Sequence, residues 1–181
     1  VNIGGISNIT YIDSENEIKS YDSGPGNCLI DKFLQFKSNN KIYFDKNGEI
    51  ASRGSINEII LENYLSDPFY NILPPKSLDV NDFSLGQIRG LSLEDTICTL
   101  TDLTARTIVD SFNFFKKKPE LIIFSGGGRK NLYLKQRIKY LSKIKTIDID
   151  SYKLNGDFIE SQAFAYLATR SLLNKPISFP G

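Results

Sequence analysis

The stretch VNIGGISNITYIDSENEIKSYDSGPGN, residues 1–27, decides the fold of this chain. Its opening is apolar around a Gly-Gly pair, and the residues that follow alternate between two faces, as a half-buried strand does. Glu15 and Asn16 are expected to form a tight turn before a third short strand. Short strands joined by tight turns predict an antiparallel meander. We expect it to end at Asp22, because Ser-Gly-Pro-Gly-Asn at 23–27 is typical of a turn.

Helical patterns dominate after this turn. Apolar residues recur at helical spacing from Asn27, and a short amphipathic helix is expected over 56–65. A longer helix opens at Ser92 and is expected to end at the lysines 116–118. The apolar run 121–124 precedes three glycines, which is typical of a buried parallel strand. A helix, a strand and a final amphipathic helix are expected after it, at 131–141, 146–149 and 157–173.

The order of these elements predicts the fold class. Three strands and a helix come first, an insertion at about 37–91 follows, and helices then alternate with strands. This order predicts an α/β fold with a mixed sheet and helices on its faces. A length of 181 residues suits one domain or one lobe of a two-lobed enzyme.

Composition narrows the possible chemistry. The chain contains no His, so Ser-His-Asp and Cys-His catalysis are excluded and proton transfer falls to carboxylates, Lys, Tyr or Cys. A net charge of +1 favours neither nucleic acid nor an anionic membrane, and no apolar run has membrane-spanning length. Cys28 and Cys98 are expected to be two buried, reduced thiols. The chain also lacks Met and opens on Val1, which suggests a piece excised from a longer protein.

Two motifs in the first 27 residues allow either a chemical or a purely structural role. The pair Gly4 and Gly5 lets backbone amides approach an anion closely, but it also suits an ordinary hairpin turn. Asp22 lies at a strand end, just before a Gly-Pro-Gly turn and a helix start. It is a natural general base in a chain without His, or it simply caps the turn.

Two later motifs leave a similar choice. Gly126, Gly127 and Gly128 form a flat platform for an adenine or a phosphate, with Asn131 offering an amide; the alternative is a tight strand-to-helix turn. Three glycines exceed what such a turn needs, which favours a functional role. Glu160 completes a capping box with Asp157, or it points toward the apolar stripe of its helix and is used or paired there.

Weaker signals come from two loops and one helix. The segments 44–48 and 74–77 could each present a charged group to a ligand, although such loops are more often merely solvated. In the long helix, Thr99 is expected at the surface and Thr104 in the packing interface.

Together these motifs resemble the anhydro-N-acetylmuramic acid kinase family. The similarity runs from Val1 to Pro180 and rests on segments that occur in the family's order: NIGGISNIT, YDSGPGNCLID, FDKNGEIASRG, LPPKS, TLTDLTARTI, FSGGGRKN and GDFIESQAFAYLATRSL. It is thinner over 53–66 and 78–92. The resemblance implies one lobe of an actin-like ATPase fold, with a ribonuclease H-like five-stranded mixed sheet built as βββαβαβα.

The resemblance also implies an activity. Such enzymes use ATP and Mg²⁺ to phosphorylate O6 of 1,6-anhydro-N-acetylmuramic acid while water opens the anhydro ring, giving N-acetylmuramate 6-phosphate for cell-wall recycling. On the matching positions it makes Asp22 the catalytic base. It assigns nucleotide contacts to Gly4, Gly5, Asn8, Gly126, Gly127, Gly128 and Asn131, and sugar contacts to Asn27 and Glu160. No residue is assigned as a direct metal ligand.

Two departures from the family pattern define further expectations. The family's Gly/Ser/Thr-rich phosphate loop is missing, so residues 1–181 are expected to be the carboxy-terminal lobe and to be inactive alone. The segment Pro74 to Asp79 ends in Leu-Asp where the family has Thr-Gly, which puts a sugar contact by Lys76 or Ser77 in doubt. The protein is expected to be cytoplasmic and, at full length, a homodimer.

Two alternatives stay open at this stage. One is a nucleotide-binding lobe without catalysis, which would not need a carboxylate at Asp22. The other is a kinase for a different sugar on the same fold.

Overall fold

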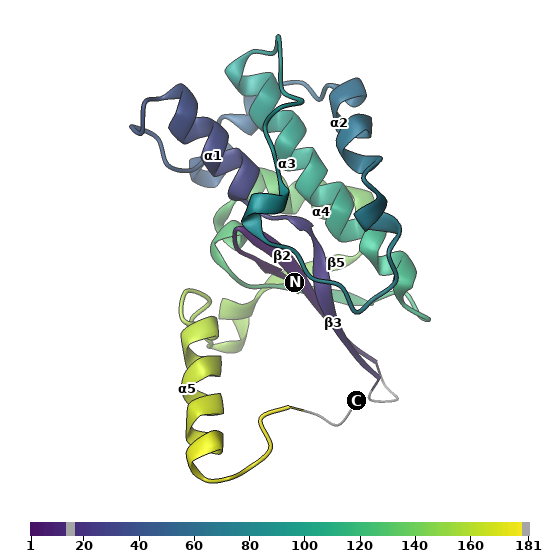
Figure 1. Ribbon diagram of the computed structural model, residues 1–181, viewed down its shortest axis with the longest axis vertical. Helices are drawn as coiled ribbons and strands as arrows, with labels where there is room; N and C mark the ends of the chain where they lie inside the picture. The colour runs from purple at the N-terminus through teal and green to yellow at the C-terminus, as the bar shows by residue number, and fades with distance from the viewer. Residues whose placement is uncertain (14–16, 179–181) are drawn as a thin grey trace.

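A computed structural model describes residues 1–13 and 17–178, so the turn expected at Glu15 and Asn16 lies outside the described residues. The fold is α/β, as predicted (Figure 1). One sheet is antiparallel and a second is parallel, so the strand directions are mixed. The first contains β1 (Asn2–Ile3), β2 (Ile6–Ile12) and β3 (Ile18–Pro25); the second contains β4 (Leu121–Phe124) and β5 (Lys145–Asp148).

Backbone hydrogen bonds connect the two sheets at β1. The amide of Ile3 donates to the carbonyl of Ser125 at 3.0 Å, and the amide of Ser125 donates to the carbonyl of Val1 at 2.9 Å. Asn2 and Ser125 form a parallel bridge there. Among the described residues, strand pairing gives one sheet of three strands and one of two, linked by this bridge, so the single five-stranded sheet that the resemblance implies is not confirmed.

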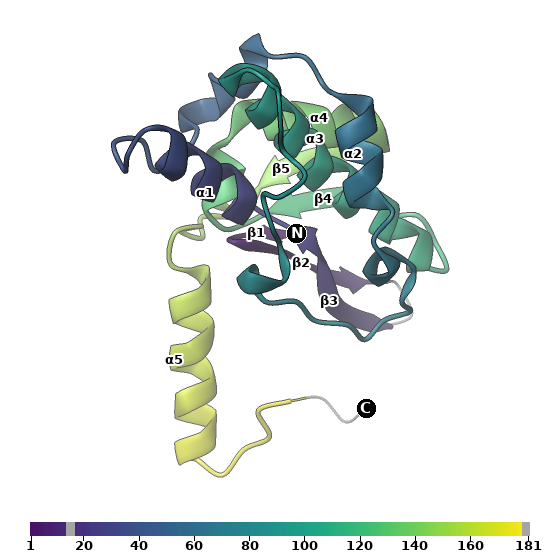
Figure 2. The same cartoon turned by 45° about the horizontal axis from the view of Figure 1, so that its top comes forward.

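Four helices gather on one side of the strands, and the fifth stands apart (Figures 1 and 2). Ser92 caps α3 by accepting the amide of Asp95 at 3.0 Å, and Asn131 caps α4 in the same way through Leu134. The helices are α1 (Cys28–Lys37), α2 (Glu58–Leu65), α3 (Leu93–Asp110), α4 (Leu132–Ser142) and α5 (Ile159–Leu172).

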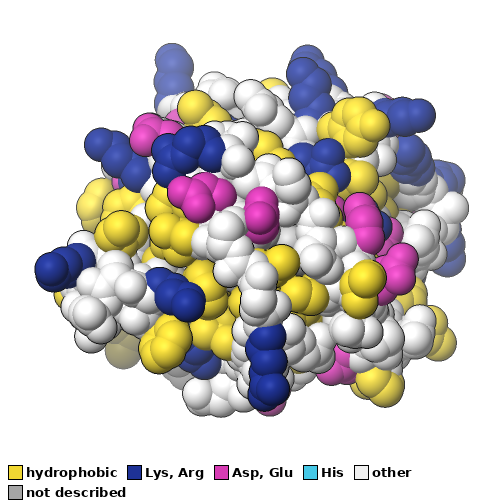
Figure 3. All heavy atoms as spheres, turned by 90° about the horizontal axis from the view of Figure 1, so that it is seen from above, with side chains coloured by type: hydrophobic (Ala, Val, Ile, Leu, Met, Phe, Trp, Pro, Cys, Tyr) yellow, Lys and Arg dark blue, Asp and Glu magenta, His cyan; other side chains and the backbone are white. Residues whose placement is uncertain are grey.

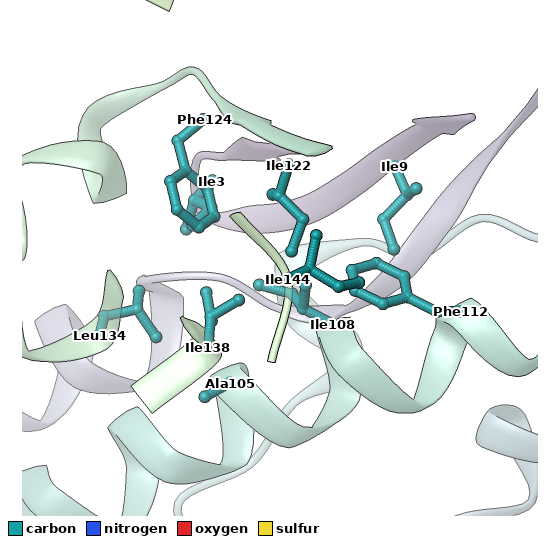
Figure 4. Close-up of a cluster of buried hydrophobic side chains, with 10 residues drawn as sticks. All are labelled: Ile3, Ile9, Ala105, Ile108, Phe112, Ile122, Phe124, Leu134, Ile138 and Ile144. Atoms are coloured by element: carbon teal, nitrogen blue, oxygen red, sulfur yellow. The ribbon is translucent and has the colours of Figure 1, made fainter. Parts of the chain in front are cut away.

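The main core lies between the strands and the two central helices. Figure 4 shows side chains of the strands facing side chains of α3 and α4. Packing the sheet against the helices in this way buries the apolar face of each. Its members are Ile3, Ile9, Ala105, Ile108, Phe112, Ile122, Phe124, Leu134, Ile138 and Ile144. A second cluster joins α1, α2 and α3 around Leu34, Leu61 and Leu100. The helical spacing of Ile97, Leu100, Thr104 and Ile108 predicts a core-facing stripe on α3, and all four are buried. Phe112 and Phe115 continue the same spacing but lie beyond the end of the helix.

Two predicted boundaries were wrong. The strand β3 continues past Asp22 to Pro25, because a bulge at Ser23 lets Gly24 and Pro25 keep pairing with Ser7 and Ile6. The Ser7 and Ser23 hydroxyls hydrogen-bond there at 2.6 Å. At the strand end proline loses no ladder bond. The helix α3 stops at Asp110, well before the lysines, and Phe115 stacks on Tyr11 with 4.1 Å between the ring centroids.

Side-chain placement on α1 and α3 corrects the expectations for Thr99 and Cys28 and confirms the expectation for Thr104. Phe36 lies outside the core at 72% exposure. Thr99 is fully buried, and its hydroxyl oxygen accepts the amide of Asn57 at 2.9 Å, which anchors the start of α2. Thr104 packs as predicted and donates to the carbonyl of Gly26 at 2.8 Å. Cys28 and Cys98 are free thiols, as predicted, although Cys28 is only half-buried.

The surface carries charged side chains of both signs. Acidic and basic side chains are interspersed on the face that Figure 3 shows, in line with the near-zero net charge. Within residues 1–13 and 17–178, no helix is both long and apolar enough to cross a bilayer.

Candidate functional site

Asp22 is held in a fixed orientation by two neighbours. The side-chain amide of Asn8, on the paired strand β2, donates to Oδ1 of Asp22 at 3.0 Å. The backbone amide of Leu78 donates to Oδ2 at 2.8 Å. The carboxylate is half-buried, so it faces solvent on one side while both its oxygens are positioned. This is the geometry expected of a general base that waits for a substrate.

The Gly-Pro-Gly-Asn turn packs directly against the first glycine pair. The amides of Gly26 and Asn27 donate to the carbonyls of Gly5 and Gly4 at 2.9 and 2.8 Å. The side chain of Asn27 donates to the carbonyl of Gly4 at 3.0 Å as well. A Cβ on Gly26 would lie 2.3 Å from that carbonyl, so only glycine fits. Asn27 is thus engaged in holding the two turns together.

The three consecutive glycines divide into two kinds. Gly126 has φ +76°, and a Cβ there would lie 2.6 Å from Oδ1 of Asn2. A Cβ on Gly128 would lie 2.3 Å from the side chain of Ile3. Packing and backbone conformation therefore explain these two. Gly127 has open space around it, with no heavy atom within 4 Å of an added Cβ, so close packing does not explain its choice.

Asn131 is placed by its own helix. Its side chain is nearly buried and accepts the amide of Leu134 at 3.0 Å, which is ordinary N-capping. The amide oxygen also lies 2.3 Å from where a Cβ on Gly48 would project. The contacts of the Asn131 side chain are therefore structural.

An arginine that the sequence did not single out ties the glycine loop to the last part of the chain. The Arg129 side chain is 6% exposed and pairs with Asp150 and Asp157, both at 2.8 Å. It also donates to the carbonyl of Gly126 at 3.0 Å. These charge-assisted bonds raise the pKa of the guanidinium and lower that of Asp150 to about 2. Asp150 and Asp157 lie 21 and 28 residues from Arg129 in the sequence, so a local sequence pattern does not predict these ion pairs.

Both readings of Glu160 were wrong as far as packing is concerned. The helix α5 has no buried residue, so Glu160 is exposed and not on a core-facing stripe. Phe164, on the same helix, is 66% exposed. Asp157 does not cap α5 but binds Arg129 and Lys130, and the helix begins without a side-chain cap. The structure does not bring Glu160 into contact with Asp22.

The two weaker loop motifs are structural in this structure. Asp45 is buried and accepts the backbone amides of Ile50 and Ala51, each at 2.9 Å, so it stabilises its own loop. Lys76 directs its ammonium to the carbonyl of Phe69 at 3.1 Å. The charges of Asp45 and Lys76 are thus held by protein groups, whereas Lys46 in the first loop is exposed to solvent, as expected of a solvated loop.

Acidic groups near the site are few. Among residues 1–13 and 17–178, no group of three or more carboxylates and thiols lies close enough to hold a metal ion. Burial raises the pKa of Asp31, in the first turn of α1, to about 6. Among the described residues, Asp22 differs from Asp31 in that both its oxygens accept hydrogen bonds, from Asn8 and from the Leu78 amide.

Direct contacts link the parts of this site near one end of β1, β2 and β3. Asn8 binds Asp22, the two glycine turns bind each other, and the glycine loop that contains Gly127 packs against Ile3. Such clustering of strand ends and helix starts is where α/β enzymes bind their ligands. Fold and site together define an α/β protein with one positioned carboxylate beside two glycine turns.

Comparison with known proteins identifies the family. A family model for anhydro-N-acetylmuramic acid kinase matches residues 1–181, and the chain belongs to this family. Proteins of that name from Zymomonas mobilis, Pelagibacter ubique and Caulobacter vibrioides are 41%, 48% and 38% identical to it. The matches cover 99%, 99% and 100% of this chain but 49%, 50% and 48% of those proteins. The chain thus spans about half the length of the curated relatives it matches.

Proposed function

We propose that this chain forms the carboxy-terminal lobe of an anhydro-N-acetylmuramic acid kinase and carries its catalytic base. The observation that carries the proposal is the fixed carboxylate of Asp22, held by Asn8 and the Leu78 amide beside two glycine turns, in a chain of this family. The reaction would consume ATP, water and 1,6-anhydro-N-acetylmuramic acid, and would yield ADP and N-acetylmuramate 6-phosphate.

The reaction requires one base. Asp22 accepts a proton from a water molecule as that water attacks the anomeric carbon. The bond from that carbon to O6 breaks, and O6 attacks the γ-phosphorus in line as the bond to the leaving ADP oxygen breaks. This resembles inverting glycoside hydrolysis, with phosphoryl transfer in place of the general acid. Asn8 and the Leu78 amide keep the carboxylate aimed, which supports the positioning that such chemistry needs.

The nucleotide would lie along the glycine turns. Open space at Gly127 and the solvent-exposed Gly5 support contacts by the backbone there, whereas Gly126, Gly128 and Asn131 would shape the loop from behind. Mg²⁺ typically binds through phosphates with one or two carboxylates, so it would arrive on ATP and neutralise its charge.

The finer fold assignment belongs to the same proposal. Hydrogen bonds from β1 to residues 123–125 support a continuous sheet in the order β3-β2-β1-β4-β5, as in a ribonuclease H-like lobe. Glu160 would reach the sugar only if α5 adopts another position in the assembled enzyme. A cytoplasmic location and a homodimer remain predictions.

A coupled assay tests this function. The complete gene product is incubated with ATP, Mg²⁺ and either 1,6-anhydro-N-acetylmuramic acid or common hexoses, while ADP release and the phosphorylated sugar are followed. We expect turnover with the anhydro sugar and essentially none from residues 1–181 alone. Preference for a hexose would favour the second sugar-kinase hypothesis, and nucleotide binding without any turnover would favour a non-catalytic lobe.

Neighbouring glycines give a matched test of the nucleotide surface. Gly127→Ala adds a methyl group into open space, so we expect stability to change by less than about 0.5 kcal/mol while ATP affinity falls severalfold. Gly128→Ala forces a methyl group against Ile3 and should cost about 2 kcal/mol of unfolding free energy. Thermal unfolding and nucleotide titration of both variants check this. Unchanged ATP affinity in Gly127→Ala would remove Gly127 from the binding surface.

A further inference from the structure

The segment 76–78 crosses β3 at Asp22 and contacts this residue twice. The amide of Asp22 donates to the carbonyl of Lys76 at 3.0 Å, and the amide of Leu78 donates to Oδ2 of Asp22 at 2.8 Å. We call residues 76–78 the strap. Because Leu78 acts through its backbone, its departure from the family's Thr leaves the bond in place. The strap fixes both the main chain and the carboxylate of Asp22.

One side chain fastens the strap to the body of the protein. The ammonium of Lys76 donates to the carbonyls of Phe69 and Tyr70 at 3.1 and 3.4 Å. It also lies over the rings of Phe69 and Phe114, 4.5 and 4.7 Å from their centroids. Two carbonyls and two aromatic faces are the surroundings that a partly desolvated cation prefers.

These contacts decide what Lys76 can do. Its positive charge is directed into the 68–71 turn and toward the aromatic residue that follows α3, and its donors are used there. Burial lowers the pKa of the ammonium, while the carbonyls and rings compensate for lost hydration. A sugar or phosphate contact by Lys76 would require breaking this set of interactions.

Resting on the proposed role of Asp22, we propose that Lys76 is a positioning residue: it anchors the strap that orients the catalytic carboxylate. It touches neither substrate nor nucleotide. Loosening the strap leaves Asp22 in the site but lets its carboxylate rotate, and a misplacement of about 1 Å can cost about a hundredfold in rate. The expected signature is therefore a fall in kcat without a change in substrate binding.

The test compares three substitutions in the complete gene product. Lys76→Met keeps the apolar stem and removes the charge and donors, and we expect kcat to fall by about ten- to a hundredfold with both KM values within about twofold. Lys76→Arg keeps a cation over the rings and should recover most of kcat. Lys19→Met is the matched control, because Lys19 donates to the carbonyl of Phe114 but does not touch the strap. Its kcat should stay within about twofold of wild type.

Other outcomes overturn the proposal. Wild-type kcat in Lys76→Met would show that the anchor is dispensable, and a raised KM with unchanged kcat would make Lys76 a substrate contact. Failure of Lys76→Arg to recover activity would also contradict it. If Lys76→Met does not fold, Lys76→Gln, which keeps a donor, undergoes the same comparison. Asp22→Asn is measured alongside: activity in that variant refutes the proposed function itself, whereas its inactivity with a normal Lys76→Met refutes the anchoring role alone.

Discussion

Asp22→Asn in the complete gene product is expected to lower kcat by about a thousandfold while ATP binding stays within about twofold of wild type. The substitution removes the carboxylate that Asn8 and the Leu78 amide hold in a fixed orientation. An asparagine at this position cannot accept a proton from water, yet it fills the same space. Steady-state turnover of 1,6-anhydro-N-acetylmuramic acid and nucleotide titration provide the two readouts.

The fold should survive this change. The new amide oxygen can still accept the Leu78 amide, and Asn8 can turn its own amide to accept from the new NH₂ group. Glu120→Gln is the matched control, since Glu120 is an exposed carboxylate just before β4. Both variants should unfold within a few degrees of wild type. Turnover by Asp22→Asn within a few-fold of wild type would contradict the assignment of Asp22 as the base.

Local patterns predicted the parts of the fold that depend on near neighbours. The start of α3 could be predicted because Ser92 and Asp95, three residues apart, form its cap. Its core face could be predicted because Ile97, Leu100 and Ile108 recur at helical spacing. The strand β4 and the glycine loop after it could be predicted for a similar reason, because an apolar run is followed closely by glycines. Such signals lie within a few residues of one another.

Distant contacts account for what the sequence did not predict. Asp22 was chosen as a base, but its bond from Leu78 spans 56 residues, and nothing in the Pro-Pro-Lys-Ser segment announces a strap. The stripe on α5 was read as a core face because apolar residues recur there, yet periodicity does not tell whether a partner surface is present. By contrast, Asp102 and Arg106 are four residues apart on α3 and their ion pair could have been predicted.

Arg129→Met is expected to release the last part of the chain from the body. The segment from Ile149 to α5 is attached through the pairs that Asp150 and Asp157 make with Arg129, and α5 itself has no buried residue. Removing a nearly buried cation lowers the unfolding free energy by about 3 to 5 kcal/mol when the partner carboxylates are buried too. Here both carboxylates can rehydrate, so we expect a loss of about 2 kcal/mol in unfolding free energy.

Hydrogen exchange distinguishes local release from general destabilisation. In Arg129→Met, protection should fall first in residues 150–158 and at Gly126, whose carbonyl also accepts from Arg129, while the α3 core stays protected. Lys130→Met is the matched control: Lys130 pairs with the same Asp157, but its side chain is 61% exposed, so its loss should change stability little.

The ion pair of Asp150 with Arg129 also predicts how stability depends on pH. The pKa of Asp150 is lowered to about 2, so the stabilisation that this ion pair gives is present above about pH 4 and lost as pH falls through about 2. The difference in unfolding free energy between wild type and Arg129→Met should shrink over that range, and a difference undiminished at pH 2 would show that the Asp150 ion pair is not its source.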